Sequence, residues 1–466
     1  MASVGAPASA RRTHRTTSRP LLAIVGAGAS GTLTAAHVLR AARGQWRVVL
    51  IDRESYGTGV AYSTRDPRHL VNVSADCMSA FDDDPDDLLR WCHARGHAVR
   101  ESDYIQRQLY GAYLRDLLVR FAGPDDLDLL RGQVIAIDHD GEQSEFALEL
   151  RDGGRVVANA VVLAIGNPRP APLVPTHANS RVIEDPWDPE ALERAKHSAR
   201  VVVVGSGLTS IDIAQTLTAA SAVTQVIAVS RHGALPRAHL ATKPKVVPPP
   251  LTLDDNSVGL EDLSRAINAA VRVQPSQWRS VVDSLRPLTP DLWRGLSLDD
   301  RRTFLRDLKW EWDIHRHRMA PPVAREINTL LAERRFQVER GTIAAVTTTS
   351  TAIIVHVEHD GERRDIVADW LINATGPGST VPSAEDSLIQ QLLADGLATP
   401  DALGIGIACD STGALLSAYR GANARLFTLG PPRRGELLES TAIREIRSQA
   451  KAISGILSSQ PSAARR

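Results

Sequence analysis

Two glycine-rich segments hold the residues whose spacing points most directly to chemistry. The first contains Gly26, Gly28 and Gly31, between an apolar run and a stretch of helical periodicity. In such a segment the first glycine permits a tight turn, the second lets backbone approach a pyrophosphate, and the third lets the helix pack closely on the strand. The helix N-terminus then directs N–H groups at the phosphates. We therefore predict a dinucleotide site here, with Ser30 among its contacts.

An acidic residue closes the strand that follows this helix. Asp52 lies 24 residues after Gly28, where a carboxylate can accept hydrogen bonds from an adenosine ribose. Arg53, next to it, is included in the predicted site. The glycine pattern alone is weak and is also compatible with a simple strand-to-helix turn. The prediction therefore depends on the strand before it, the helix after it and the acid at this distance.

The second segment repeats the first, but arginine replaces the acid. Counting 24 residues from Gly207 leads to Arg231. A carboxylate suits a free ribose 2′-hydroxyl, whereas arginine suits a 2′-phosphate. We therefore expect FAD at the first segment and NADPH at the second. The predicted contacts of the second segment are Gly205, Gly207, Ser210, Ser230, Arg231 and His232.

Two of these assignments have an alternative. Arg231 is otherwise a solvated charge at the end of a strand. His232 could supply a further hydrogen-bond donor, but a lone histidine in a loop is more often structural.

Length and composition indicate the class of protein that positions these segments. A chain of 466 residues predicts two or three domains. Its 54 basic and 54 acidic residues leave no net charge, so nothing suggests a nucleic-acid or membrane-surface partner. Cys77, Cys92 and Cys409 form no CxxC pair, which argues against a disulfide framework, a metal site and a dithiol enzyme. Without a membrane-length apolar run, we expect a soluble, cytoplasmic protein with a small-molecule substrate.

A repeated strand pattern indicates two related units. Residues 133–166 and 343–376 each predict a small antiparallel meander followed by an apolar strand that stops at a glycine, Gly166 or Gly376. Each glycine would let the chain turn away beside a bound nucleotide. Between the meanders, residues 240–340 begin with a Pro-rich run, and the sequence predicts helices after it.

The helical stretch contains a candidate substrate group. The i, i+3 rule places Trp312, His315 and Arg318 near one helical face, ended by the pair Pro321-Pro322. Packing of Trp312 beside solvated neighbours is at least as good an explanation of the pattern.

The C-terminal stretch predicts a strand ending at Gly430 and then a helix that starts near Ser440 and Thr441. The positive end of this helix would stabilise the charge that a flavin gains on reduction. An ordinary Ser or Thr helix cap is compatible with the same residues.

From residue 20 to 455 the chain resembles the flavoproteins with two dinucleotide-binding domains. The motifs YGTGVAYST, HLVNVSADCMSAF, WDIHRHRMAP and LGPPRRGELLESTAIREIR resemble a largely uncharacterised bacterial branch of FAD/NAD(P)-binding oxidoreductases. That branch is similar to the class B flavin monooxygenases and the amine N-hydroxylating monooxygenases. The resemblance implies an α/β fold with two Rossmann-like domains, the second inserted in the first.

The resemblance also implies domain limits and one catalytic residue. Residues 1–19 contain arginines and no acid, a composition that suggests a transit peptide or, more readily, a disordered basic tail. The FAD-binding domain would cover 20–170 and 371–466. The NADPH-binding domain would cover 198–370, with its helical insertion at about 240–340. Asn72, in HLVNVS, would lie near the isoalloxazine; the alternative is an asparagine that caps a loop turn.

The function we expect is an FAD-dependent, NADPH-consuming monooxygenase that uses molecular oxygen on a nitrogen or sulfur of a small molecule. The stretch after Gly166 lacks the FxGxxxH motif of Baeyer–Villiger enzymes, so that chemistry is not expected. One alternative is an NADPH:acceptor reductase or dehydrogenase. Another is a flavin-binding regulatory protein without turnover.

Overall fold

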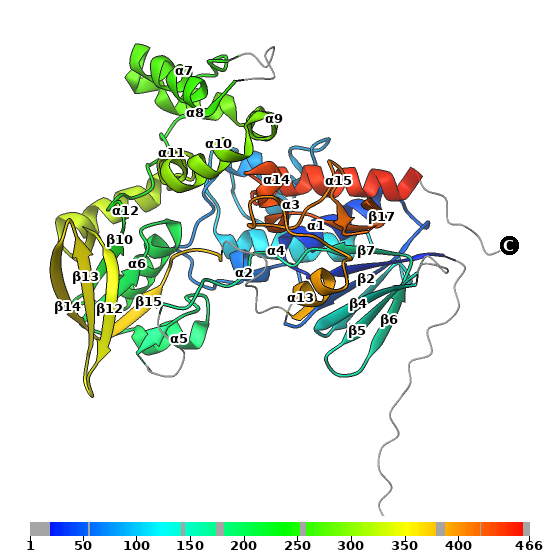
Figure 1. The fold of residues 1–466 in the computed structure, drawn as a ribbon, viewed down its shortest axis with the longest axis horizontal. Helices are drawn as coiled ribbons and strands as arrows, with labels where there is room; N and C mark the ends of the chain where they lie inside the picture. Colours follow the sequence, from blue (N-terminus) through cyan, green and yellow to red (C-terminus); the bar gives the residue numbers. More distant parts are fainter. Residues whose placement is uncertain are drawn as a thin grey trace, which may run out of the picture.

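The computed structural model describes residues 19–54, 56–140, 145–173, 181–251, 258–378, 387–419 and 421–459. Within these ranges the chain forms two sheets that are parallel apart from the antiparallel edge strand β16 (Ala414–Ser417), two antiparallel meanders and a group of helices above them (Figure 1). The expected basic tail lies outside the described residues, apart from Arg19. No described helix is both long and apolar enough to cross a membrane.

The first sheet has six strands in the order β16-β17-β7-β1-β2-β3. β1 pairs in parallel with β2 on one side and β7 on the other, and β17 continues the parallel order beyond β7. The central strands are almost completely buried, as expected for a parallel sheet covered on both faces. The bounds are β1 Leu21–Val25, β2 Arg47–Asp52, β3 Leu127–Arg131, β7 Ala160–Leu163, β16 Ala414–Ser417 and β17 Gly421–Thr428.

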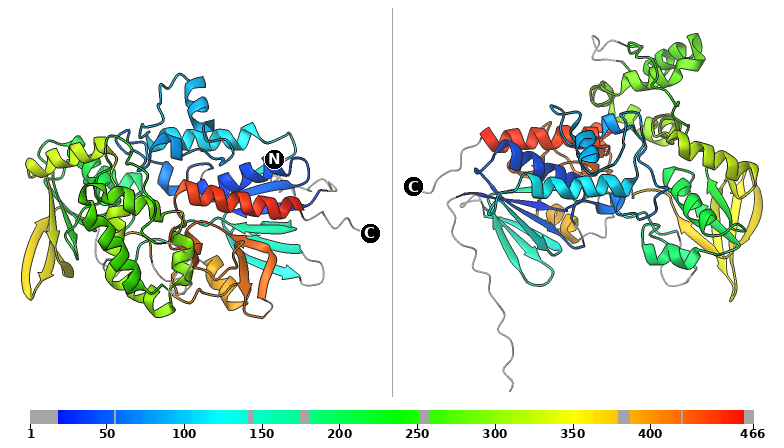
Figure 2. Two further views of the ribbon diagram at one scale, coloured as in Figure 1. Left: turned by 90° about the horizontal axis from the view of Figure 1, so that it is seen from above. Right: turned by 180° about the vertical axis from the view of Figure 1, so that it is seen from behind.

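Different layers cover the two faces of this sheet. The long helices α1, α4 and α15 share one hydrophobic core with α3, and the meander β4-β5-β6 shares the other with α13 (Figure 2). Helices α3 and α4 lie before and after Gly96 in the chain. The bounds are α1 Ala29–Ala41, α2 Gly59–Tyr62, η1 Ala75–Cys77, α3 Asp87–Ala94, α4 Arg107–Arg120, α13 Ser387–Ala394, η5 Pro431–Arg433, α14 Arg434–Leu437, α15 Ile443–Ser459, β4 Val134–Asp140, β5 Glu145–Leu150 and β6 Arg155–Ala158.

The second sheet has five parallel strands in the order β11-β10-β9-β15-β8. Helices α5, α6 and α12 pack on one face, and the predicted second meander, β12-β13-β14, packs on the other. The bounds are β8 Val182–Ile183, α5 Pro189–Ala195, β9 Arg200–Val204, α6 Leu208–Ala220, β10 Gln225–Ser230, α12 Pro321–Ala332, β11 Phe336–Arg340, β12 Thr342–Thr348, β13 Ile353–His359, β14 Glu362–Ala368 and β15 Trp370–Asn373.

Two of the expected limits are shifted by strand pairing. The first unit was expected to resume at residue 371, but this position lies inside β15, whose backbone pairs with β9 in the second sheet. The expected insertion, 240–340, includes α12 and β11, which complete the second sheet and its core. Pro321 and Pro322 follow α11 (Lys309–Arg316), as expected, and they occupy the first turn of α12, where proline is tolerated.

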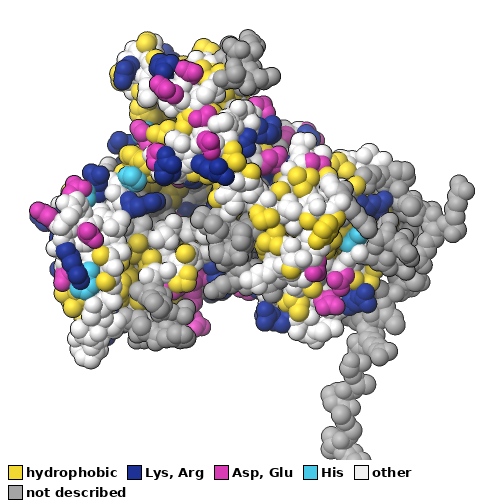
Figure 3. Space-filling model, in the orientation of Figure 1, with side chains coloured by type: hydrophobic (Ala, Val, Ile, Leu, Met, Phe, Trp, Pro, Cys, Tyr) yellow, Lys and Arg dark blue, Asp and Glu magenta, His cyan; other side chains and the backbone are white. Residues whose placement is uncertain are grey.

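The remaining helices project from the second unit and reach over the first (Figure 1). One point of contact is Trp293, whose indole N–H donates to the carbonyl of Gly435 at 2.8 Å. In the space-filling view the surface is hollowed below these helices, between the two sheets (Figure 3). The bounds are α7 Leu260–Val273, η2 Pro275–Gln277, α8 Trp278–Leu285, α9 Thr289–Gly295, α10 Leu298–Thr303, the π-helical turn η3 Phe304–Leu308 and α11 Lys309–Arg316.

Candidate functional site

The first glycine segment forms the expected turn between β1 and α1. Gly26 has a φ of +101°, and a Cβ there would lie 2.3 Å from the carbonyl oxygen of Ala164. A Cβ on Gly31 would lie 1.9 Å from the carbonyl oxygen of Gly26. Both glycines are therefore required by the turn and by the close packing of the helix on the strand.

Gly28 is the N-cap of α1 and supplies no side-chain cap, so the helix start keeps N–H groups available for an anion. A Cβ on Gly28 would lie 3.4 Å from Cα of Gly59, which brings the YGTG motif to this turn. Ser30, inside α1, is buried beneath Gly430: a Cβ on Gly430 would lie 2.7 Å from its hydroxyl oxygen. The C-terminal turn therefore closes over the first nucleotide loop.

Asp52 holds the loop through its carboxylate. Oδ2 accepts the Ala27 N–H at 2.7 Å, and Oδ1 accepts the Glu54 N–H at 2.9 Å. The carboxylate is half-buried and lies beside the glycine turn, where a ribose is expected. Arg53 is exposed, with its guanidinium 3.5 Å from the Glu54 carboxylate.

The second glycine segment reproduces the backbone of the first. Gly205 has a φ of +109°, and its Cβ would lie 2.4 Å from the Ala374 carbonyl oxygen. Gly207 is the uncapped N-cap of α6, with an ordinary φ of −77°, and its Cβ would meet no atom within 4 Å. Neither conformation nor protein packing requires glycine there. The open space in front of α6 fits the close approach of a phosphate, and Ser210 replaces the third glycine by donating its hydroxyl to the Gly207 carbonyl at 2.7 Å.

Ser230, Arg231 and His232, at the end of β10 and just after it, make different contacts. The hydroxyls of Ser206 and Ser230 lie 2.8 Å apart, so Ser230 helps to fix the loop. Arg231 is exposed, and its guanidinium makes no hydrogen bond or ion pair with a described residue. The His232 ring stacks on Trp310 of α11, with centroids 4.2 Å apart and planes 12° apart. A helix of the insertion therefore borders the second loop, a contact that the sequence did not indicate.

Strands β7 and β15 end at Leu163 and Asn373, three residues before Gly166 and Gly376, and the chain segments that follow them meet. The Gly378 N–H donates to the Arg169 carbonyl at 3.1 Å, so the two connections between the units are in contact. On the first of them, Asn167 accepts a hydrogen bond from Arg434 at 2.7 Å.

Ser440 and Thr441 lie just before α15, which begins at Ile443 rather than at these residues. The Ser440 hydroxyl is completely buried and has no partner among the described residues. An unpaired buried hydroxyl is unfavourable and fits a site that a ligand completes. Thr441 is exposed. Gln449 of α15 accepts the Gly430 N–H at 3.0 Å and ties the helix to the same turn.

Asn72 lies at the junction of the two units. Its backbone carbonyl accepts Nε2–H of His239, a residue 167 positions later, at 3.0 Å. Burial, and then the charge of Arg318, lower the pKa of His239 to about 4, so the ring is a neutral donor at pH 7. The same junction contains a buried ion pair between Arg107 and Asp212.

The three candidate substrate residues do not share one helical face. Trp312 donates its indole N–H to Glu439 at 3.2 Å, whereas His315 packs edge-on against Trp278 at 4.9 Å. Arg318 lies beyond the end of α11, in an extended segment whose residue Met319 forms a bridge with Ala238. The prediction of a common face was wrong because this backbone pairing ends the helix before Arg318.

Two further ion pairs join the insertion to the C-terminal segment. Arg316 binds both carboxylate oxygens of Glu439, at 2.7 to 3.0 Å, and Arg286 binds Glu445 at 2.8 to 3.0 Å. No sequence spacing indicates these pairs, because their partners are more than 120 residues apart. They hold the insertion over the first unit.

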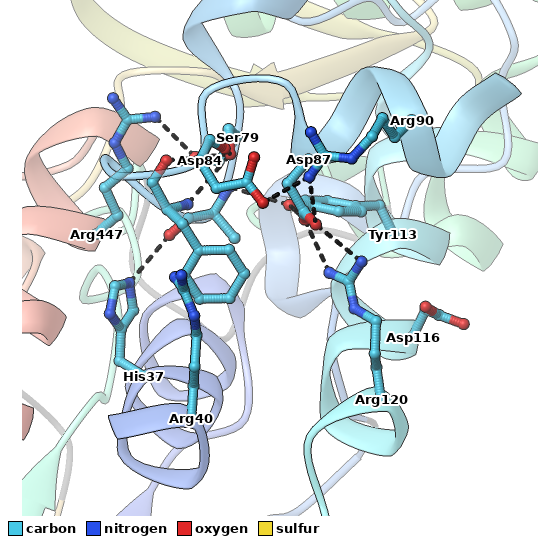
Figure 4. A network of polar contacts seen from close by, with 12 residues as sticks. His37, Arg40, Ser79, Asp84, Asp87, Arg90, Tyr113, Asp116, Arg120 and Arg447 are labelled. Atoms are coloured by element: carbon cyan, nitrogen blue, oxygen red, sulfur yellow. Dashed lines mark hydrogen bonds and ion pairs between the residues drawn. The ribbon is translucent and has the colours of Figure 1, made fainter. Parts of the chain in front are cut away.

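A polar network fixes the segment that follows Asn72 (Figure 4). The Tyr113 hydroxyl accepts a hydrogen bond from the Ala80 N–H at 3.0 Å and donates one to the Asp87 carboxylate. Asp87 also accepts hydrogen bonds from both terminal nitrogens of Arg120. His37 donates to the Ala80 carbonyl at 3.0 Å. Arg447 of α15 donates to the Ser79 carbonyl at 2.8 Å. Helices α1, α4 and α15 therefore hold this segment rigidly.

All three cysteines are described, and all three are free thiols. Burial raises the pKa of each, to about 12 for Cys409. They are therefore protonated near neutral pH and unsuited to thiolate chemistry.

Comparisons with known proteins agree with this architecture. The sequence profile of the FAD-NAD(P)-binding family matches residues 23–168. No curated protein gives a significant match. Ornithine N-hydroxylase from Kutzneria sp. 744, solved with reduced FAD, NADP+ and L-ornithine, has a TM-score of 0.66 at 17% identity, over 94% of this chain and 99% of that one.

Two further solved structures cover the chain to the same extent. L-lysine 6-monooxygenase from Pseudomonas syringae has a TM-score of 0.66 at 13% identity, over 95% of this chain and 100% of that one. Bacillithiol disulfide reductase from Bacillus cereus has a TM-score of 0.56 at 14% identity, over 95% and 99%.

The chain therefore has the fold of the FAD/NAD(P)-binding oxidoreductases with two dinucleotide-binding domains. This fold is related to that of the N-hydroxylating flavin monooxygenases. The predicted α/β fold class and the resemblance are confirmed.

Proposed function

We propose that the protein is an FAD-dependent, NADPH-consuming monooxygenase acting on a nitrogen or sulfur of a small molecule. FAD is assigned to the Gly26–Gly31 loop with Asp52, Gly166, Gly430 and Ser440. NADPH is assigned to the Gly205–Ser210 loop with Arg231. From the sequence we expect Gly376 to serve FAD; because it follows β15, which pairs with β9 in the second sheet, we assign it to the NADPH loop instead. When bound, FAD would accept hydride from NADPH and react with molecular oxygen.

The protein itself positions the two nucleotides and excludes water from the site. The uncapped starts of α1 and α6 supply N–H groups to two pyrophosphates. The network around Tyr113 and Asp87 fixes the segment that follows Asn72, the residue that we assign to the flavin ring. The insertion, held by the Arg316–Glu439 pair, covers the hollow between the sheets and limits access of water.

The state of the cysteines favours this proposal over a disulfide reductase. Electron transfer through a dithiol needs two neighbouring cysteines, with one thiol readily ionised. Here the three thiols are separate and free, and burial raises the pKa of each. Electrons from the flavin would therefore pass to oxygen or to another external acceptor.

The runner-up is an NADPH:acceptor oxidoreductase without oxygen insertion, since the same cofactor loops serve both activities. A flavin-binding regulatory protein without turnover is less well supported. The second loop, with open space at Gly207 and an unpaired Arg231, would have no use in a protein that binds only FAD.

The deciding experiment mixes the NADPH-reduced protein with oxygenated buffer in a stopped-flow spectrometer. We expect a transient absorption band distinct from those of oxidised and reduced flavin. A substrate amine or thioether should then raise NADPH consumption and yield an oxygenated product. Slow reoxidation without a transient band, together with rapid reaction with a quinone, would support the reductase instead.

A further inference from the structure

Arg318 is a buried guanidinium with donors that no protein atom satisfies. Its side chain is 1% exposed. One terminal nitrogen binds Asp283, whereas Nε and the other terminal nitrogen have no acceptor among the described residues. Arginine remains charged at any accessible pH, and buried N–H donors without acceptors are costly. The arrangement therefore calls for a further acceptor.

The backbone holds this guanidinium in place. The Met319 N–H donates to the Arg237 carbonyl at 2.8 Å, and the His239 N–H donates to the Met319 carbonyl at 3.0 Å. Arg318 is thus set into a short parallel bridge beside His239. The bridge fixes the backbone next to Arg318, and the Arg318 side chain is buried.

The surroundings carry more positive than negative charge. The Arg279 guanidinium lies 4.3 Å from the centre of the Trp278 ring, and that of Arg318 lies 5.6 Å from it. Arg279 donates Nε–H to a backbone carbonyl, at 2.9 Å, rather than to a carboxylate. Asp283 is the one carboxylate bonded to either guanidinium in the described chain, and 43% of its side chain is exposed.

This positive group lies at the junction of the two units. His239 connects it to the Asn72 carbonyl, at 3.0 Å, and the Tyr104 ring lies 5.5 Å from the His239 ring. An anion bound at Arg318 would therefore lie close to the segment that we assign to the flavin ring.

We infer that Arg318, assisted by Arg279, binds an anionic group of the substrate: a carboxylate, phosphate or sulfonate. The word substrate rests on the proposed function; the anion site itself does not. The same chemistry could come from a phosphate of the coenzyme, and the experiment must separate these two sources.

The test uses the full-length, FAD-loaded protein and titrates benzoate and inorganic phosphate by calorimetry without coenzyme. Wild type should bind at least one probe saturably at one site. Arg318→Gln should weaken it by about 10- to 100-fold, the effect of losing charge-assisted hydrogen bonds. Asp283→Asn should bind the probe more tightly, because it removes the competing carboxylate. Arg265→Gln, an exposed arginine on α7 that pairs with Glu261 and Asp262, is the matched control and should bind as wild type does.

Arg318→Lys keeps the charge and should bind with intermediate affinity, so the test stands even if the glutamine variant fails to fold. The proposal is overturned if wild type binds neither probe saturably, or if the Arg318 variants bind as well as wild type. It is also overturned if NADP+ displaces the probe and Arg318→Gln lowers the affinity for NADP+ by the same factor as the affinity for the probe. The site would then belong to the coenzyme. Flavin reduction by NADPH is followed separately, so that its failure would count against the proposed function alone.

Discussion

Arg107 Nη2 lies 2.8 Å from Asp212 Oδ2, and this buried ion pair joins α4 of the first unit to α6 of the second. Burial raises the pKa of Asp212, and the charge of Arg107 opposes that shift. The positive charge of Arg107 therefore favours the ionised form of this buried carboxyl. The relative orientation of the two units therefore depends on the Asp212 carboxylate, which is unfavourable in a buried position without the arginine.

Replacing this arginine should destabilise the protein strongly. Arg107→Ala leaves the Asp212 carboxylate buried and unpaired, which costs about 3 to 5 kcal/mol. Urea unfolding at pH 7 measures the loss. The control is Arg100→Ala, which removes an arginine 83% exposed in its pair with Asp103 and should cost within about 0.5 kcal/mol. Equal losses in the two variants would mean that the junction does not rely on the pair.

The two glycines of the second loop should respond differently to alanine. Gly207→Ala places its Cβ in open space, so thermal unfolding should change little while NADPH binding weakens through contact with the phosphates. Gly205→Ala combines a φ of +109° with a contact of 2.4 Å to a backbone carbonyl and should destabilise the fold itself. Melting curves and flavin reduction at varied NADPH measure both effects. Unchanged NADPH affinity in Gly207→Ala would argue against a phosphate at α6.

Arg231→Ala should remove the preference for NADPH. A charged hydrogen bond is worth about 1.5 to 3 kcal/mol, so NADPH binding should weaken roughly 10- to 100-fold. NADH lacks the 2′-phosphate and should be little affected. Asp52→Ala is the converse variant: it should lower FAD retention without altering the NADPH/NADH ratio. If Arg231→Ala leaves that ratio unchanged, Arg231 is a solvated strand-end charge and the coenzyme assignment falls.

Acid should destabilise the protein partly through His37. Burial lowers the pKa of His37 to about 4, from 6.5 in the unfolded chain. Its contribution to stability is therefore complete above pH 6.5 and is lost as the pH falls toward about 4. A shift of this size is worth roughly 3 kcal/mol.

His37→Gln keeps a donor for the Ala80 carbonyl but does not titrate. Between pH 7 and pH 4 this variant should lose less stability than wild type, by up to roughly 3 kcal/mol. Urea unfolding across this range measures the difference. His97→Gln, at an exposed site, should follow the wild-type curve. Parallel curves for wild type and His37→Gln would contradict the prediction.

Much of the candidate site could be predicted because its signals are local. Each nucleotide loop lies within one strand-turn-helix unit, so the spacing of Gly26, Gly28 and Gly31 carries the geometry. The structure shows this geometry twice, with the Ala164 and Ala374 carbonyls against the first glycine of each loop. The link between Asn72 and His239 is of another kind. It joins residues 167 positions apart, and no periodicity in the sequence reports it.

The sequence by itself determined the α/β class, the two glycine loops and both meanders, because hydrophobic alternation and turn glycines act over a few residues. Tertiary structure decided where the elements stop and which side chains meet. Residue 371 belongs to the second sheet because its strand, β15, pairs in parallel with β9. Arg318 leaves the helix of Trp312 and His315 because the backbone of residues 237–239 offers hydrogen bonds to the chain at Met319. Such partners come together only when the chain has folded, and they place the buried, partly unsatisfied guanidinium of Arg318 at the junction of the two units.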